Sequence, residues 1–195
     1  QWGVLHNGET VYPGAFDVLN ELGRRGKAVV LLTNSGRRRS FNEARLRELG
    51  FNTRALAGIV ASGEAAWQSL GQRSVEPFAS LGRRCLLFTR ADDMGPVEGL
   101  DLELVADPRE TDFIYLTWLD TLTHTLDEYD RLIGIAAERG LPMVCSNPDR
   151  VAPTEGGLTQ APGSLAERYR ELGGRVIHIG KPYRPIYETC LDLLD

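Results

Sequence analysis

The chain alternates short apolar runs with helix-type segments along most of its 195 residues. An apolar run of four or five residues between turn signals is typical of a strand buried on both faces. Parallel strands of this kind need helical crossovers between them, so the alternation predicts an α/β fold built on a parallel sheet. The expected strands are Trp2 to Leu5, Ala28 to Leu32, Ala57 to Ala61, Arg84 to Phe88, Leu102 to Val105, Phe113 to Trp118, Pro142 to Ser146 and Arg175 to Ile179.

Helix signals fall between these runs. Two capping boxes, Ser40 with Glu43 and Thr125 with Glu128, mark helix starts, because a hydroxyl and a carboxylate three residues apart satisfy free backbone amides. The expected helices follow Pro13, begin at Ser40 and Thr125, span 62–70 and 164–172, and begin again at Pro185.

The charge balance excludes one class of partner. A formal net charge of -5 and a pI near 5.3 argue against a nucleic-acid groove, which needs a clustered excess of Lys and Arg. The run Arg37-Arg38-Arg39 departs from this balance. It is either a solvated face at a helix entry or an anion-attracting rim beside a phosphate site.

Cysteine usage and hydropathy indicate the compartment. The 3 cysteines are widely spaced and form no C-x-x-C pair, so they suggest neither a disulfide framework nor a zinc site. No stretch approaches the roughly 20 apolar residues of a membrane helix. We expect a soluble cytoplasmic protein with no membrane or nucleic-acid partner.

Three separated segments stand at the carboxyl ends of expected strands, where open parallel sheets gather their ligands. They are Trp2-Gly3-Val4-Leu5, Thr33-Asn34-Ser35 and Gly180-Lys181-Pro182. A lone polar loop or a lone Gly-Lys-Pro turn is common, but both together, separated by a domain-sized insert, are more specific.

Together with Asn147-Pro148-Asp149, the order and spacing of these segments resemble the class IIA branch of the haloacid-dehalogenase (HAD) superfamily, which includes nucleotide and p-nitrophenyl phosphatase-like enzymes. The resemblance spans essentially the whole chain. It implies a three-layer, Rossmann-like parallel-sheet core with an inserted α/β cap domain. The implied divisions are core over 1–75, cap over 76–173 and core again over 174–195.

The family motifs place specific roles on this sequence. Gly3-Val4-Leu5 fits the tail of the first motif, D-x-D-G-[TV]-[LI], if the nucleophilic Asp directly precedes Gln1. A fourth, acidic motif is expected after Asp195, so the resemblance implies a chain truncated at both ends. Thr33 becomes the hydroxyl of the second motif and Lys181 the lysine of the third. Mg²⁺ is the implied cofactor, with the backbone carbonyl of Trp2 as the ligand within this chain.

The same roles have a physical reason. A phosphomonoester is a dianion, so attack by a carboxylate requires positive charge and hydrogen-bond donors around the phosphoryl group. Lys181 supplies a fixed charge. The hydroxyl of Thr33 and the amides of Asn34 and Ser35 supply donors at a strand-to-loop turn. We expect Thr33 and Lys181 to be catalytic, and Asn34 and Ser35 to bind phosphate.

Two further segments are expected near the substrate. Asn147-Pro148-Asp149 either forms an Asx-type turn or faces the active site at the boundary of core and cap, with Asn147 and Asp149 touching substrate. By resemblance, Trp118-Leu119-Asp120 leads into a substrate-facing cap loop, so Asp120 is expected near the leaving group. Trp118 itself is expected to be a core residue.

Trp2 departs from the family pattern. It stands where hydrolytic members carry a second Asp that protonates the leaving group and activates water, and indole can do neither. Loss of a general acid-base typically costs roughly 10²- to 10⁴-fold in rate. His6 lies nearby and is either a substitute acid-base group or a loop hydrogen-bonding residue.

The leading interpretation is an HAD-type phosphatase that hydrolyses a small phosphomonoester through an aspartyl-phosphate, with a homodimer through the cap as its assembly. The alternative is a degenerate member that binds a phosphorylated metabolite or transfers phosphate without efficient hydrolysis. A nucleotide-binding doubly wound domain is a weaker third interpretation, because His6-Asn7-Gly8-Glu9 lacks the G-x-G-x-x-G spacing.

Overall fold

The computed structural model describes residues 1–121, 123–154 and 157–194. No helix in these ranges combines the length and the apolar character that crossing a membrane would need. In chain order the elements are α1 Ala15–Arg24, β1 Val30–Thr33, α2 Arg39–Glu48, the 3-10 turn η1 Thr53–Ala55, β2 Gly58–Ala61, α3 Ser62–Gln72, β3 Arg84–Phe88, β4 Glu103–Leu104, β5 Phe113–Leu116, α4 Leu126–Glu138, β6 Pro142–Cys145, β7 Val151–Thr154, β8 Gly157–Gln160, α5 Pro162–Glu171, β9 Arg175–His178 and α6 Arg184–Leu191.

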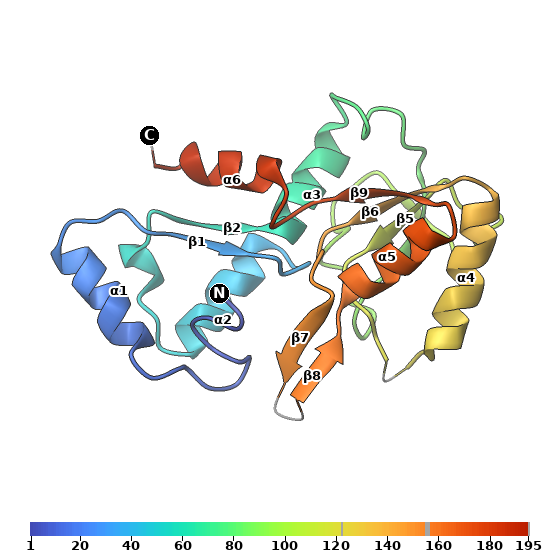
Figure 1. The fold of residues 1–195 in the computed structure, drawn as a ribbon. Coiled ribbons are helices and arrows are strands. Elements are labelled where there is room, and N and C mark those ends of the chain that lie inside the picture. Colours follow the sequence, from blue (N-terminus) through green and yellow to red (C-terminus); the bar gives the residue numbers. More distant parts are fainter. Residues whose placement is uncertain (122, 155–156, 195) are drawn as a thin grey trace.

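The chain forms two packed bodies that lie side by side (Figure 1). In the first body, β1 and β2 pair in parallel, with Leu31 opposite Ile59. Helices α1 and α2 bury apolar side chains against this pair, including Leu46, which is fully buried. Helix α6, at the end of the chain, packs against β2 and so belongs with this body (Figure 1).

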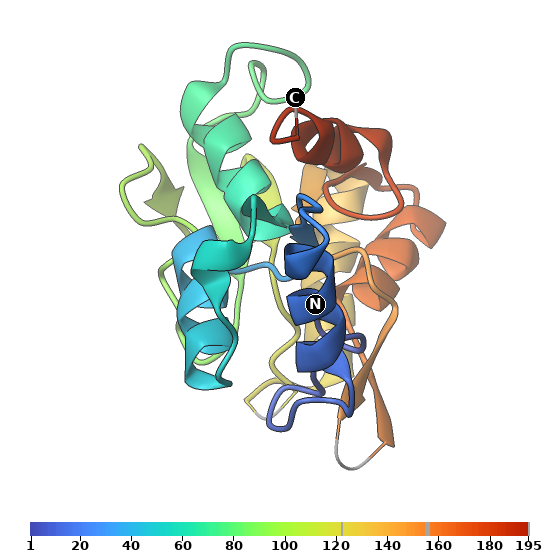
Figure 2. The same cartoon turned by 90° about the vertical axis from the view of Figure 1, so that its left-hand side faces the viewer.

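The second body is a five-stranded parallel sheet in the order β4-β3-β5-β6-β9. Alternate residues of each strand point to opposite faces, as the pleat requires. Leu86, Ile114 and Met143 pack under α4 and α5, whereas Phe113 and Val144 pack on the face that α3 covers. Figure 2 shows α3 and α5 on opposite sides of these strands. This three-layer arrangement confirms the predicted α/β class.

Most predicted elements are confirmed, but two local predictions are wrong. Trp2 to Leu5 is not a strand: Gly3 has φ 77° and the chain turns back at once, leaving isolated bridges from Trp2 to His6 and from His6 to Val11. The capping box predicted at Ser40 is absent, because α2 begins one residue earlier, at Arg39. Glu64 of α3 instead accepts a hydrogen bond from the Arg39 amide at 3.0 Å.

The second capping box is confirmed, since the side chains of Thr125 and Glu128 each bond to the other's backbone amide. The antiparallel hairpin β7–β8 was not predicted. It extends downward in Figure 1 from the second body, beside the boundary with the first.

The division into core and cap remains a proposal, but strand pairing favours one change in it. β9 was assigned to the returning core, yet Met143 pairs with Val176 and Cys145 with His178 inside the second sheet. The chain then enters α6, which packs on the first body. We therefore propose that the return to the first body falls near residue 180 rather than at 174.

Candidate active site

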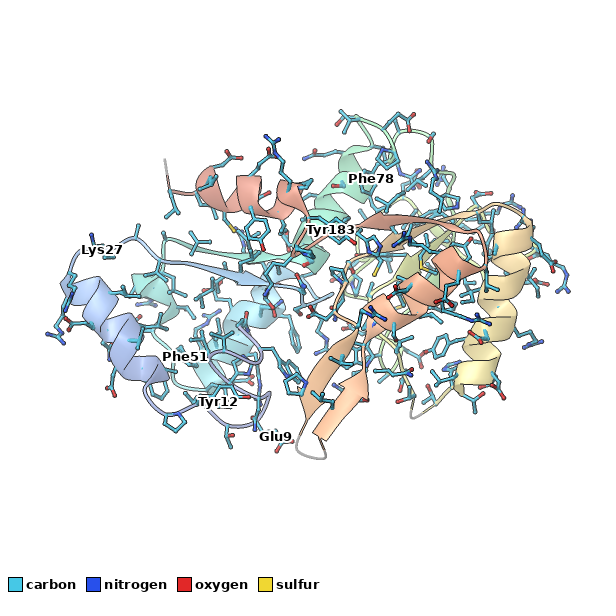
Figure 3. The ribbon with its side chains drawn as sticks, viewed as in Figure 1. Glu9, Tyr12, Lys27, Phe51, Phe78 and Tyr183 are labelled. Atoms are coloured by element: carbon cyan, nitrogen blue, oxygen red, sulfur yellow. The ribbon has the colours of Figure 1, made fainter. Side chains whose placement is uncertain are left out.

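A pocket of about 600 Å³ lies between the two bodies, at the carboxyl ends of both sheets. Its walls include the residues that follow β1, β3, β5 and β6 and the turn after β9. Side chains from loop 6–11 and from hairpin β7–β8 close one end, where Figure 3 labels Glu9. Thr33 and Lys181, which stand 148 positions apart in the sequence, both line this pocket.

Thr33 ends β1 and is 4% exposed. Its Oγ1 accepts a hydrogen bond from the Ser35 amide at 3.2 Å, which leaves the hydroxyl proton of Thr33 to donate into the pocket. The Ser35 amide itself therefore bonds to Thr33 in this structure, rather than facing the pocket as an open donor. Both residues line the pocket, so the loop still presents hydroxyl groups to a ligand.

The side chain of Asn34 holds the Lys181 turn at two backbone atoms. Its Oδ1 accepts from the Lys181 amide at 2.7 Å, and its Nδ2 donates to the Lys181 carbonyl at 3.1 Å. Nδ2 also donates to Asp149 Oδ1 at 2.8 Å. Asn34 is 4% exposed and its amide group is committed to these partners. Its side chain thus positions other pocket residues, and the phosphate contact predicted for the Asn34 backbone amide stays a prediction.

Gly180 allows this close approach. Its φ is +115°, and a Cβ atom there would lie 2.6 Å from Ser62 Oγ and 2.7 Å from Asn34 Oδ1. A side chain would push Asn34 away from the turn. The Lys181 side chain leaves this turn with no carboxylate within 4.0 Å among the described residues, so its ammonium charge is available to an anion.

Asn147 and Asp149 also line the pocket, after the end of β6. Asn147 Oδ1 accepts from the Asp149 amide at 3.2 Å, so the segment forms an Asx-type turn and faces the pocket at the same time. Asn147 is 6% exposed, whereas Asp149 is exposed and reaches Asn34 across the boundary between the two bodies.

Asp120 does not line the pocket. It is 5% exposed, and its Oδ2 accepts a hydrogen bond from the Ala91 amide at 2.9 Å. Its carboxylate therefore anchors the turn after β3, which argues against the predicted contact between Asp120 and the leaving group. Trp118, which was expected in the core, is instead half-buried and lines the pocket.

Trp2 and His6 both line the pocket from the first turn of the chain. The Trp2 indole donates to the Pro153 carbonyl of hairpin β7 at 3.0 Å, so it ties the loop to the second body. His6 Nδ1 accepts from the Gly8 amide at 3.0 Å, as expected for a loop hydrogen-bonding residue. Burial lowers the pKa of His6, and the nearby Arg45 charge adds to the effect. Because Nδ1 accepts from Gly8, the proton of the neutral ring sits on Nε2.

The three arginines of the run take different positions. Arg37 lines the pocket and pairs with Asp93 at 3.0 Å. Arg38 makes a two-point contact with Glu64 and stacks on Trp67, 3.5 Å from the ring centroid. Burial would raise the pKa of Glu64, but hydrogen bonds from Arg38 and from the Arg39 amide hold it below its usual value. The arginine run was interpreted either as a solvated face or as an anion-attracting rim, and the position of Arg37 on the pocket wall fits the rim.

The described residues do not supply a complete Mg²⁺ site. No group of three His, Cys, Asp or Glu side chains in these ranges converges on one point. Asp149 lies beside the Lys181 turn, and Trp2 also lines the pocket. Octahedral coordination of Mg²⁺ by oxygen needs more than an Asp149 carboxylate and a Trp2 carbonyl, so a complete site would require further ligands.

Comparison with known proteins decides the family. A sequence model described as "Haloacid dehalogenase-like hydrolase" matches residues 1–103. The chain belongs to the haloacid dehalogenase-like hydrolase family. A structure of an HAD-like hydrolase from Brucella suis 1330 superposes with a TM-score of 0.87 at 32% identity, covering 99% of this chain and 68% of that one.

Other HAD relatives extend the comparison. Chronophin from Rattus norvegicus is 29% identical over 198 residues, which cover 97% of this chain and 62% of the rat protein. The chain thus spans less than two thirds of that relative's length. A glycerol phosphate phosphatase from Mycobacterium tuberculosis, solved in complex with magnesium, shares the fold, with a TM-score of 0.71 at 22% identity over 97% of this chain and 55% of that one.

Sequence reasoning missed Arg90 and Trp118 as pocket residues. Arg90 follows β3 by two positions and Trp118 follows β5 by two, so both stand at carboxyl ends of parallel strands. The same rule that identified Thr33 would have identified them. The role of Asn34 had no sequence signal of this kind, because its partners lie 115 and 147 positions away.

Proposed function

We propose that the protein containing this chain is a phosphatase that hydrolyses a small phosphomonoester through an aspartyl-phosphate intermediate with Mg²⁺. The observation that supports it most is the presence of Thr33 and Lys181 on the wall of one pocket, with Asn34 holding the Lys181 turn. The phosphatases among the structural relatives point the same way.

The roles proposed for this chain concern charge and orientation. The Lys181 ammonium offsets the negative charge of the phosphoryl group, and the Thr33 hydroxyl donates to one of its oxygens. Asn34 keeps the Lys181 turn in place, and Asp149 in turn accepts a hydrogen bond from the Asn34 side chain across the pocket. Gln1 lines the same pocket, so a residue directly before it in the whole protein would lie close to these groups.

In the proposed reaction, an aspartate oxygen forms a bond to phosphorus as the ester P–O bond breaks. The leaving oxygen takes up a proton, and water then attacks phosphorus to release inorganic phosphate and regenerate the aspartate. The family resemblance puts that aspartate directly before Gln1, so the proposal applies to the whole protein. Mg²⁺ would neutralise charge on the transferring group. A homodimer through the second body and a cytoplasmic location belong to the same proposal.

The test uses the full-length protein and p-nitrophenyl phosphate. We expect Mg²⁺-dependent release of p-nitrophenol, and a loss of about 10²-fold or more in kcat/KM for Lys181→Ala, because a preorganised charge on the transferring group is removed. Lys27→Ala is the matched control, since Lys27 is the other lysine of the sequence and lies at the far end of the first body (Figure 3).

Thr33→Val tests the hydroxyl separately, because valine keeps the shape of the threonine side chain. Equal activity of Lys181→Ala and Lys27→Ala would contradict the proposal. Tight binding of phosphorylated metabolites without turnover would instead favour the degenerate alternative, for which the indole at position 2 is the motivating feature.

A further inference from the structure

Besides Lys181, the pocket contains a second cation without an acidic partner. Four cationic side chains line it: Arg37, Arg45, Arg90 and Lys181. Arg37 pairs with Asp93 at 3.0 Å, and Arg45 pairs with Glu48 at 2.9 Å. Within the described ranges, neither Arg90 nor Lys181 has a carboxylate within 4.0 Å.

Arg90 stands on the second body, in the turn that follows β3. Its guanidinium carbon lies 5.4 Å from the ring centroid of Trp118, which also lines the pocket. Arg37 is close enough to feel its charge: burial lowers the pKa of Arg37, Asp93 raises it, and Arg90 lowers it again. Arg37 thus has one carboxylate partner and Arg90 has none among the described residues, so this part of the wall carries a net positive charge.

The turn that presents Arg90 is held in a strained conformation. Ala91 and Asp92 have φ values of 46° and 56°, which side-chain-bearing residues rarely adopt. The buried Asp120 carboxylate fixes the Ala91 amide, and the Asp93 amide bonds to the Arg90 carbonyl at 2.9 Å. Strain kept in place by buried hydrogen bonds is typical of ligand-binding turns.

We infer that Arg90, with Arg37 and Trp118 beside it, forms a second anion-binding subsite in the pocket. This inference rests on the proposed function and names its substrate class: a small phosphomonoester whose leaving group carries another anionic group, either a carboxylate or a second phosphate. Lys181 binds the phosphate that is transferred, and Arg90 binds the other end of the substrate. A guanidinium recognises either group, because its paired N–H donors match two oxygens.

The test compares matched substrates on the full-length protein. Glycerol 3-phosphate and 3-phosphoglycerate differ at the far end, where a hydroxymethyl group replaces a carboxylate. Fructose 6-phosphate and fructose 1,6-bisphosphate test a second phosphate in the same way. We expect kcat/KM to be higher for the more anionic member of at least one pair. A preference in the first pair indicates that the subsite recognises a carboxylate, and a preference in the second pair indicates that it recognises a phosphate.

Arg90→Gln should lower this preference about fivefold, as expected for one partly exposed ionic contact, while Arg90→Lys should retain part of it. Arg39→Gln is the control, because Arg39 belongs to the arginine run, is exposed and does not line the pocket. The inference is overturned if neither pair shows a preference, or if Arg90→Gln and Arg39→Gln change it equally.

Calorimetric titration with the same four compounds separates this inference from the proposed function. Turnover without discrimination would leave the phosphatase proposal standing and reject the Arg90 subsite. Preferential binding of the more anionic compounds that Arg90→Gln abolishes, without any turnover, would support the subsite and reject hydrolysis. Absence of both binding and turnover would reject both.

Discussion

Replacing Asn34 with alanine should loosen the turn that carries Lys181. Asn34 is 4% exposed and makes bonds of 2.7 and 3.1 Å to the Lys181 backbone. Each of these neutral hydrogen bonds contributes about 1 kcal/mol. The 2.8 Å bond to Asp149 ends on an exposed carboxylate and is expected to add only about 0.5 kcal/mol. We therefore expect Asn34→Ala to lower the free energy of unfolding by about 2 to 3 kcal/mol.

The same substitution should reduce activity more than stability alone explains. With the turn released, Lys181 no longer meets the phosphate in a fixed position, and a misplacement of about 1 Å typically costs about 10²-fold in rate. Urea unfolding followed by tryptophan fluorescence measures the first effect, and steady-state kinetics on p-nitrophenyl phosphate at a temperature where the variant is folded measures the second.

Asn20→Ala is the matched control, because Asn20 is an exposed asparagine of helix α1 outside the pocket. It should change the free energy of unfolding by no more than about 0.5 kcal/mol and leave kcat/KM unchanged. A fully active Asn34→Ala variant with unchanged stability would show that the Asn34 amide does not hold the Lys181 turn, and the positional argument for Lys181 would then fail.

Three further predictions concern the surroundings of the pocket. Gly180→Ala should destabilise the protein by about 2 kcal/mol or more, and Gly99→Ala by only about 1 kcal/mol. Both glycines have positive φ, but only a Cβ at Gly180 would meet atoms within 3 Å. Equal losses of stability in thermal unfolding would show that these close contacts at Gly180 have no effect. Folding lowers the pKa of Glu64, so the ionised carboxylate stabilises the fold fully above its ordinary pKa of 4.5. This stabilisation is lost as pH falls through the lower pKa of the folded state. The stability gap between wild type and Glu64→Gln should narrow in unfolding experiments from pH 7 to pH 4, and a constant gap would contradict this. Trp2→Phe removes the indole donor to the Pro153 carbonyl and should cost about 0.5 kcal/mol in the thermal unfolding of the full-length protein, whereas an unchanged Tm would mean that water replaces the bond without loss.

The parts of the fold that sequence predicts well are those set by continuous apolar runs. Arg84 to Phe88 was predicted with the bounds it has, because Cys85 to Phe88 form a continuous apolar run that begins after two arginines. Hairpin β7–β8 was missed because it is short, largely exposed and contains Pro153 and Gly157, which are typical of loops. The first apolar run fails as a strand because the positive φ of Gly3 ends its extended backbone.

For the site, the carboxyl-end rule predicted that Thr33 and Lys181 would share a pocket, and applied throughout it would also have included Arg90. It could not predict the functions of individual side chains. Asn34 and Asp120 are both polar residues just after strand ends, yet one holds the Lys181 turn and the other a neighbouring turn. The partner of each side chain depends on how distant segments of the chain pack together, and this packing cannot be predicted from the neighbouring residues in the sequence.

The surroundings of Lys181 and those of Arg90 are held by different kinds of interaction, and on the proposed function this difference has a consequence for specificity. Around Lys181, neutral hydrogen bonds from the buried Asn34 side chain fix the turn, and salt screens such bonds little. Around Arg90, the Arg37–Asp93 pair is about 30% exposed and Arg90 is exposed, so both are open to screening. Rising ionic strength should therefore weaken recognition of the leaving group before it disturbs the geometry of phosphoryl transfer, which separates substrate choice from catalysis within one pocket.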